Sequence, residues 1–250
     1  MESRRKLDRA FVAGATGLTG RYVVQHLTAL GVPTVAHIRP DSSRLEHWSE
    51  TFTRQGAQVS TAEWDAASMI GEMKAVQPTV VFGLLGTTKA RTRGGDGDYE
   101  AVDFGLTACL IDACVPLEER PKFVYLSAVG VKPDSSSAYY KARAQAEDKL
   151  RRSDLPALVA RPSFILGERD DARPGERIGA PILDGLLGGL GLLGAKRFTA
   201  RYRSMTGEEL AAGLAELALN GSSDDVVHVP ELRAAGQRLL HRIASRDEQP

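Results

Sequence analysis

The chain has 250 residues, and its 32 basic residues are matched by 32 acidic residues, so the formal net charge at pH 7 is zero. This balance argues against partners that select basic proteins, such as nucleic acids or anionic membrane surfaces. Apolar residues make up 42% of the chain, enough to form one large domain, or one domain with a small appendage.

Apolar runs alternate with helical patterns along the first two thirds of the chain. Expected strands begin with Phe11-Val12-Ala13 and continue at 34–39, 56–60, 79–85, 122–126 and 157–161. Expected helices lie at 18–30, 45–54, around 69–76, at 99–114 and at 139–152. Alternation of this kind predicts an α/β fold with a doubly wound, Rossmann-like parallel sheet.

The last third has a different composition from the rest. We predict a dinucleotide-binding core at 1–162 and, at 163–250, a small C-terminal appendage of the same domain on the substrate side. Expected there are a helix at 206–219 with a capping box, a final strand at 226–229 and a disordered tail from about 245.

Cysteine usage and the apolar runs bear on location. Cys109 and Cys114 lie five residues apart in a helical pattern, which suits buried free thiols in a reducing compartment. No apolar stretch of signal-peptide length follows the basic N-terminus. The run 180–195 holds Asp184 and five glycines, which makes it a poor membrane span. These features predict a cytoplasmic protein without a membrane span.

Three glycines at a spacing of three follow the first strand. Gly14 allows a sharp turn, Gly17 leaves room for a pyrophosphate, and Gly20 lets the next helix pack closely. The N-terminus of that helix favours an anion, so dinucleotide binding is more plausible than a simple tight connection. The residues predicted to meet the pyrophosphate are Gly14, Thr16, Gly17, Leu18, Thr19 and Gly20.

The residues beyond the second strand indicate which cofactor is bound. An NAD-binding chain would carry an acidic residue about 20 positions after the glycine turn. This chain has Arg39 there, with Arg44 close behind, and a guanidinium can pair with the 2′-phosphate of NADP(H). The alternative is a solvated surface arginine. Asp65 could accept a bond from the adenine amino group or cap the next helix, and these roles are compatible.

Several segments resemble those of atypical short-chain dehydrogenases/reductases, and in particular the Tat-interacting-protein-like oxidoreductases, whose members bind NADPH. The segments are the turn 14–20, Leu85-Gly86-Thr87-Thr88-Lys89, Val102-Asp103, Arg161-Pro162 and Arg173-Pro174-Gly175-Glu176. The resemblance covers nearly the whole chain up to about the final helix. Gly86, Thr87 and Pro162 directly follow strands, so they are expected to meet the cofactor at the carboxyl edge of the sheet.

The resemblance implies an active site in which a tyrosine is followed by a lysine four residues later and assisted by a hydroxyl after the fifth strand. Tyr139 falls on the tyrosine, Arg143 on the lysine and Ser127 on the hydroxyl. Arginine keeps the positive charge, but it is bulkier and cannot lose its proton. In the alternative interpretation, Tyr139 begins a helix and packs against the core.

Two functions compete. The first is an NADP(H)-dependent oxidoreductase that transfers hydride to a small carbonyl, enone or quinone. The run 182–193 would line its pocket, or else form core or a homodimer face. The second is a non-catalytic NADP(H)-binding sensor or regulatory module, which Arg143 favours. An epimerase or dehydratase acting on a nucleotide sugar is a weaker third hypothesis, because it would need the tyrosine–lysine pair.

Overall fold

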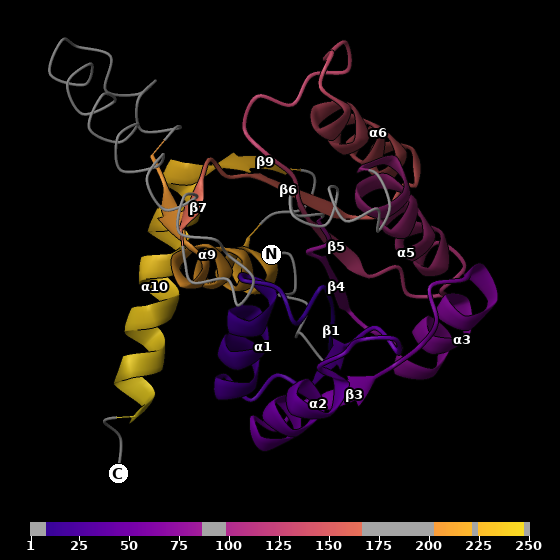
Figure 1. Ribbon diagram of the computed structural model, residues 1–250. Coiled ribbons are helices and arrows are strands. Elements are labelled where there is room, and N and C mark those ends of the chain that lie inside the picture. The colour runs from indigo at the N-terminus through magenta and orange to yellow at the C-terminus, as the bar shows by residue number, and fades with distance from the viewer. Residues whose placement is uncertain (1–8, 87–98, 167–202, 222–224, 248–250) are drawn as a thin grey trace, which may run out of the picture.

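The computed structural model describes residues 9–86, 99–166, 203–221 and 225–247. Its centre is a seven-stranded sheet in the order β3-β2-β1-β4-β5-β6-β9, in which every neighbouring pair is parallel (Figure 1). The strands are β1 (Ala10–Ala13), β2 (Thr34–His37), β3 (Gln58–Ser60), β4 (Val80–Gly83), β5 (Lys122–Leu126), β6 (Ala157–Arg161) and β9 (Asp225–His228). The predicted doubly wound, Rossmann-like fold is confirmed.

Helices cover both faces of this sheet. They are α1 (Gly20–Ala29), α2 (Leu45–Arg54), α3 (Ala66–Val76), η1 (Glu100–Leu106), α5 (Thr107–Cys114), α6 (Ala138–Arg152), α9 (Gly207–Asn220) and α10 (Val229–Asp247). One face packs against α1, α2, α9 and α10, and the other against α3, α5 and α6. Each face therefore has its own hydrophobic core, the first beneath α1, α2, α9 and α10 and the second beneath α3, α5 and α6. Strand β1 contributes to both, since Val12 faces the first core and Phe11 the second.

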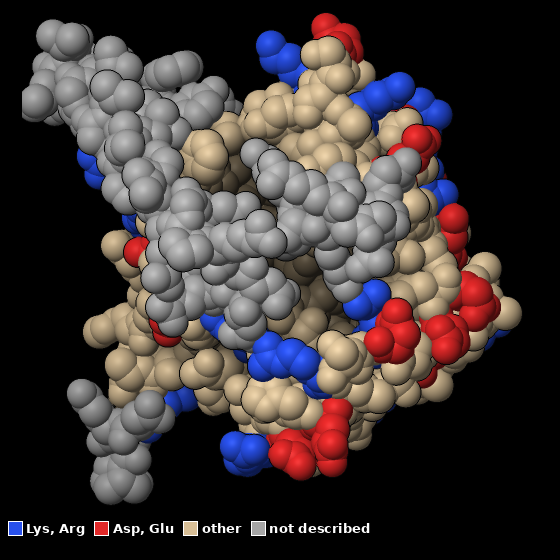
Figure 2. Space-filling model, viewed as in Figure 1, with Lys and Arg blue, Asp and Glu red and all other residues tan. Residues whose placement is uncertain are grey.

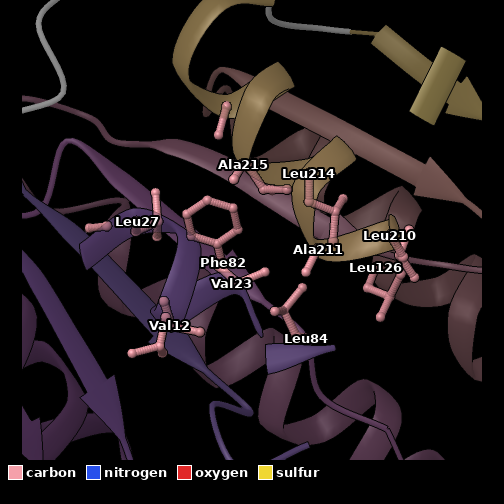
Figure 3. Close-up of a cluster of buried hydrophobic side chains, with 14 of the residues drawn as sticks. Val12, Val23, Leu27, Phe82, Leu84, Leu126, Leu210, Ala211, Leu214 and Ala215 are labelled. Atoms are coloured by element: carbon pink, nitrogen blue, oxygen red, sulfur yellow. The ribbon is translucent and has the colours of Figure 1, made fainter. Parts of the chain in front are cut away.

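The first core joins the beginning and the end of the chain. In Figure 3, Val23 and Leu27 of α1 lie beside Phe82 of β4, and Leu214 of α9 closes the same cluster. These side chains are fully buried, so α9 stabilises the half of the sheet that carries the glycine turn. Helix α9 begins about 190 residues after that turn in the sequence.

The helix predicted over 99–114 differs in detail from the one observed. Its first part is the π-helix η1, and α5 continues from Thr107. A π-helical turn inserts extra backbone without changing which residues are apolar, so sequence periodicity does not reveal it. Such turns are rare and often occur at functional sites.

The last third is attached to the sheet through β9 and α9. The predicted capping box is present: the Glu209 N–H donates to the Thr206 hydroxyl at 3.0 Å, and the Thr206 N–H donates to the Glu209 carboxylate at 2.9 Å. Helix α10 continues through Asp247, so the disorder predicted from Ser245 is wrong up to that residue. A second small sheet pairs β7 (Ile165–Leu166) with β8 (Met205–Thr206).

Some predictions fall outside the described residues, namely those on Thr87-Thr88-Lys89, on segment 173–176 and on the apolar runs 180–195 and 182–193.

Within the described part of the chain, no helix has the length and apolar character needed to cross a membrane. On the face drawn in Figure 2, lysine and arginine side chains lie among aspartate and glutamate side chains. Both cysteines are free thiols, and burial raises the pKa of Cys114 to about 12.

Two histidines are buried between secondary-structure elements. His26 lies on α1 and interacts with the backbone of Glu208 on α9, and His37 ends β2 with its Nε2 2.8 Å from the Ala62 carbonyl oxygen. Burial lowers the pKa of both imidazoles below the ordinary value of about 6.5. Both side chains are therefore neutral in the folded protein at neutral pH.

We expect the free energy of unfolding to decrease as the pH falls from about 7 to about 5.5, because unfolded His26 and His37 take up protons below about pH 6.5 while the folded forms resist it. Urea unfolding at the two pH values measures this. In a His26→Gln/His37→Gln variant the pH dependence should be weaker, whereas His47→Gln, at an exposed position, should leave it intact. Equal pH dependence in the wild type and the double variant would contradict the assignment.

Candidate functional site

The glycine turn lies where β1 and β4 end. Gly14 has a φ of +80°, and a Cβ added to it would lie 2.6 Å from the carbonyl oxygen of Leu84. The N–H of Gly17 donates to the Gly14 carbonyl at 3.0 Å, which closes the turn and leaves Gly17 exposed. A Cβ at Gly20 would lie 2.1 Å from the Gly14 carbonyl oxygen. The fold therefore demands glycine at Gly14 and Gly20, and the turn presents bare backbone at Gly17.

Helix α1 starts directly behind this turn. Thr19 is its N-cap residue, but no side chain caps the first N–H groups. The N–H groups of Arg21 and Tyr22 donate to the backbone carbonyl groups of Gly17 and Thr19, each at 3.2 Å, and the positive end of the helix dipole favours an anion at this terminus. Leu18 contributes backbone packing, since its carbonyl oxygen would lie 2.7 Å from a Cβ at Gly207 on α9. Thr16 is half-buried within the turn. The whole cradle fits the pyrophosphate of a dinucleotide.

The end of β2 leads into a tight turn that carries both predicted arginines. The Ser42 N–H donates to the Arg39 carbonyl at 3.0 Å, and Arg39 forms a partly exposed ion pair with Asp41 at 3.4 Å. Arg44 is exposed, with its guanidinium 5.2 Å from the centre of the Trp48 ring. Two cations therefore stand beyond β2, and the Asp41 carboxylate is an alternative partner for Arg39.

Asp65 begins α3 as its N-cap residue. Its carboxylate accepts the Ser68 N–H at 2.9 Å, and hydrogen bonding with Ser68, first with its side chain and then with its N–H, lowers the pKa of the carboxyl group. Of the two compatible roles expected from the sequence, the structure shows the helix cap.

Arg143 is directed into the protein at the ends of β4 and β5. Its guanidinium donates to the Leu126 carbonyl, to the Leu85 carbonyl at 3.2 Å and to the Asp103 carboxylate at 2.8 Å. Asp103 comes from η1 and is fully buried, and Arg143 is nearly so. A Cβ at Gly86 would lie 2.7 Å from a guanidinium nitrogen of Arg143. These donors are thus engaged by the protein's own oxygens.

Tyr139 lies one helical turn before Arg143 on α6 and is half-buried. The guanidinium carbon of Arg143 is 5.3 Å from the centre of its ring. Tyr99 and Tyr140 make edge contacts with the same ring, at centroid distances of 5.5 and 5.2 Å. The expected proximity of Tyr139 and Arg143 is present, although the cation stands over the ring and is itself paired with Asp103.

Ser127 belongs to a separate network. Its hydroxyl donates to Glu147 of α6, and Glu147 also accepts the side chain of Arg161, with Nε at 2.9 Å. Glu147 and Arg161 line a surface groove of about 1130 Å³ between α6 and the β6–β9 edge. The described structure therefore couples Ser127 to this network and gives it no hydrogen bond to Tyr139. Pro162 is buried after β6, with its carbonyl accepting the Val129 N–H at 2.8 Å.

Asp103 and Glu147 were not among the predicted site residues, although both hold a predicted one in place. An arginine on the inward face of α6 could have indicated that a buried acidic partner such as Asp103 exists, because a buried guanidinium requires a group of opposite charge. The sequence leaves open which of the 32 acidic residues supplies it.

Fold and site together define a Rossmann-type dinucleotide-binding protein. The chain belongs to the NAD(P)H-binding family, whose sequence model matches residues 14–180. Subunit 9 of the mitochondrial NADH dehydrogenase [ubiquinone] 1 alpha subcomplex from Mus musculus is 32% identical over 162 residues, covering 64% of this chain and 41% of the subunit. The chain thus spans less than half the length of that relative.

A second relative is the mitochondrial protein fmp52 of Aspergillus niger, 25% identical over 168 residues, which are 66% of this chain and 70% of that protein. Among solved structures, UDP-glucuronic acid 4-epimerase from Bacillus cereus, in complex with UDP-glucuronic acid and NAD, aligns with a TM-score of 0.62. It is 15% identical and covers 88% of this chain and 77% of its own, so the likeness shows the fold alone.

These relatives contradict the predicted cytoplasmic location, because both are mitochondrial proteins. Free cysteines report that a compartment is reducing and do not identify it, which is why the sequence argument failed.

Proposed function

We propose that the chain is an NADP(H)-dependent oxidoreductase of the atypical short-chain dehydrogenase/reductase type, similar to the Tat-interacting-protein-like oxidoreductases. The observation that carries the proposal is the glycine turn, whose Gly14 and Gly20 are sterically obligatory while Gly17 presents exposed backbone at the start of α1, which has no side-chain cap. When bound, the dinucleotide would supply a hydride to a small carbonyl, enone or quinone.

The chain's own residues would have three tasks. The turn 14–20 would hold the pyrophosphate through backbone N–H groups. Arg39 and Arg44 would pair with the 2′-phosphate. Tyr139 would donate a proton to the substrate oxygen as it becomes an alcohol, and its half-buried position on the first turn of α6 supports this role.

A second candidate, a non-catalytic NADP(H)-binding sensor or regulatory module, is favoured by the surroundings of Arg143. This cation stands where the tyrosine's lysine partner would be, but Asp103 cancels its charge and backbone oxygens engage its donors. It would therefore contribute little to activating Tyr139. The name of the mouse relative, a subunit of a larger enzyme, also suits a binding role.

One experiment separates the two candidates. NADPH binding is measured first by calorimetry, and NADPH oxidation is then followed with panels of aldehydes, enones and quinones. Binding with turnover supports the oxidoreductase, and binding without turnover supports the module. If neither NADPH nor NADH binds, both candidates fail.

We expect NADPH to bind about tenfold or more tightly than NADH, since a charge-assisted contact to the 2′-phosphate contributes about 1.5–3 kcal/mol. Arg39→Ala should reduce this preference, as measured by titrating both nucleotides. Arg120→Ala, at an exposed position remote from β2 in the sequence, serves as the control. Equal affinities in the wild type, or an Arg39→Ala variant that retains the preference, would assign the cofactor choice to other residues.

A further inference from the structure

The buried ion pair between Asp103 and Arg143 joins three segments that are distant in the sequence. Arg143 lies on α6, Asp103 lies 40 residues earlier on η1, and the guanidinium also binds carbonyl oxygens at the ends of β4 and β5. Both side chains are removed from water, so each charge depends on the other. The pair therefore fixes how η1 and α6 sit against the carboxyl edge of the sheet.

The pair lies at the ends of β4 and β5, next to the point where the strand order of the sheet reverses. The order β3-β2-β1-β4-β5 reverses between β1 and β4, and ligands of open parallel sheets bind beyond the carboxyl ends at such a reversal. With the pyrophosphate on the turn after β1 and the 2′-phosphate near Arg39 after β2, the other half of the dinucleotide would extend over β4 and β5. That is where Leu85 and Leu126 present their carbonyl groups to Arg143.

Gly86 adds an independent observation. It lies three residues after the end of β4, and the guanidinium occupies the space that a side chain would need there, 2.7 Å from the position of an added Cβ. Asp103 lies 3.7 Å from the same position. The backbone of Gly86 is thus packed against the pair, so a movement of either charged side chain would move this segment.

We propose that Asp103 and Arg143 are positioning residues that act as one neutral clamp and hold the Leu85–Gly86 segment for the nicotinamide half of the dinucleotide. The clamp explains an arginine at the lysine position: two separate guanidinium nitrogens in one plane reach oxygens of three segments, whereas the three N–H groups of an ammonium all leave from a single nitrogen atom. The proposal rests on the proposed dinucleotide binding and deepens it.

The test compares two ligands, NADPH and adenosine 2′,5′-bisphosphate, which represents the adenine half alone. Their dissociation constants are measured by calorimetry for the wild type, Asp103→Asn and Arg143→Lys. We expect the advantage of NADPH over the bisphosphate to fall about tenfold or more in both variants, while the affinity for the bisphosphate stays nearly unchanged. The matched control is Asp112→Asn, which removes the partly exposed Asp112–Lys149 ion pair between α5 and α6.

Folding is followed in parallel by urea unfolding. If a single variant does not fold, the neutral double variant Asp103→Leu/Arg143→Met takes its place, since apolar replacement of a buried ion pair often preserves stability. Gly86→Ala should reproduce the loss of NADPH affinity, because the added Cβ would displace the guanidinium of Arg143 from the pair.

The outcomes are distinct. Loss of the NADPH advantage with the bisphosphate affinity intact supports the clamp. Folded variants that keep the full advantage, or a parallel loss of both ligands, overturn it. A wild type that binds NADPH no more tightly than the bisphosphate also overturns it, while a wild type that binds neither ligand refutes the proposed function itself.

Discussion

Replacing Gly17 by valine is expected to weaken NADPH binding by more than about 100-fold while the protein remains folded. An added Cβ at Gly17 meets only the Gly14 carbonyl oxygen, at 3.1 Å, so a small adjustment of the turn can accommodate a side chain. The valine methyl groups would then occupy the exposed surface of the turn, where the pyrophosphate is proposed to lie. Losing two charge-assisted hydrogen bonds of about 1.5–3 kcal/mol each accounts for the magnitude.

Calorimetric titration with NADPH measures the effect, and thermal unfolding checks the fold. Gly71→Val provides the control, since no atom lies within 4 Å of an added Cβ at that position in α3. Normal NADPH binding by the Gly17→Val variant would mean that the dinucleotide lies elsewhere. Substitutions at Gly14 or Gly20 are less informative, because the clashes they create would disturb the fold itself.

The second large effect concerns Tyr139. If the protein turns over a carbonyl or quinone, Tyr139→Phe should lower the turnover number by about 10²–10⁴-fold, the usual contribution of a general acid. NADPH affinity should stay nearly unchanged, because the substitution removes only the hydroxyl. The packing of the ring against Tyr99 and Tyr140 should survive for the same reason.

Steady-state kinetics with a saturating substrate measure this effect, and Tyr140→Phe is the control on the same helix. An unchanged turnover in Tyr139→Phe would favour the alternative in which this tyrosine only packs at the start of α6. Turnover that falls equally in the two variants would point to the packing of the tyrosine cluster instead of proton donation by one member.

Local sequence determined the sheet and the glycine turn. Apolar runs predicted all seven strands of the parallel sheet in nearly their observed places, including the final strand at 226–229, because buried strands need runs of apolar residues. The spacing of Gly14, Gly17 and Gly20 predicted a tight turn between a strand and a helix, because the contacts of such a turn involve only residues that are close in the sequence. Even the capping box of α9 was predictable, since Thr206 and Glu209 contact each other within one helical turn.

Only the tertiary structure decided how the charged residues at the carboxyl edge are paired. Arg143 stands four residues after Tyr139 in the sequence, yet its ion-pair partner is Asp103, 40 residues away, and Ser127 is hydrogen-bonded to Glu147, 20 residues away. The seventh strand β9 likewise joins the sheet beside β6 after more than 60 intervening residues. The physical reason is that a buried charge is unfavourable unless it is paired. Which residue pairs with it depends on which segments the packing of the helices brings together.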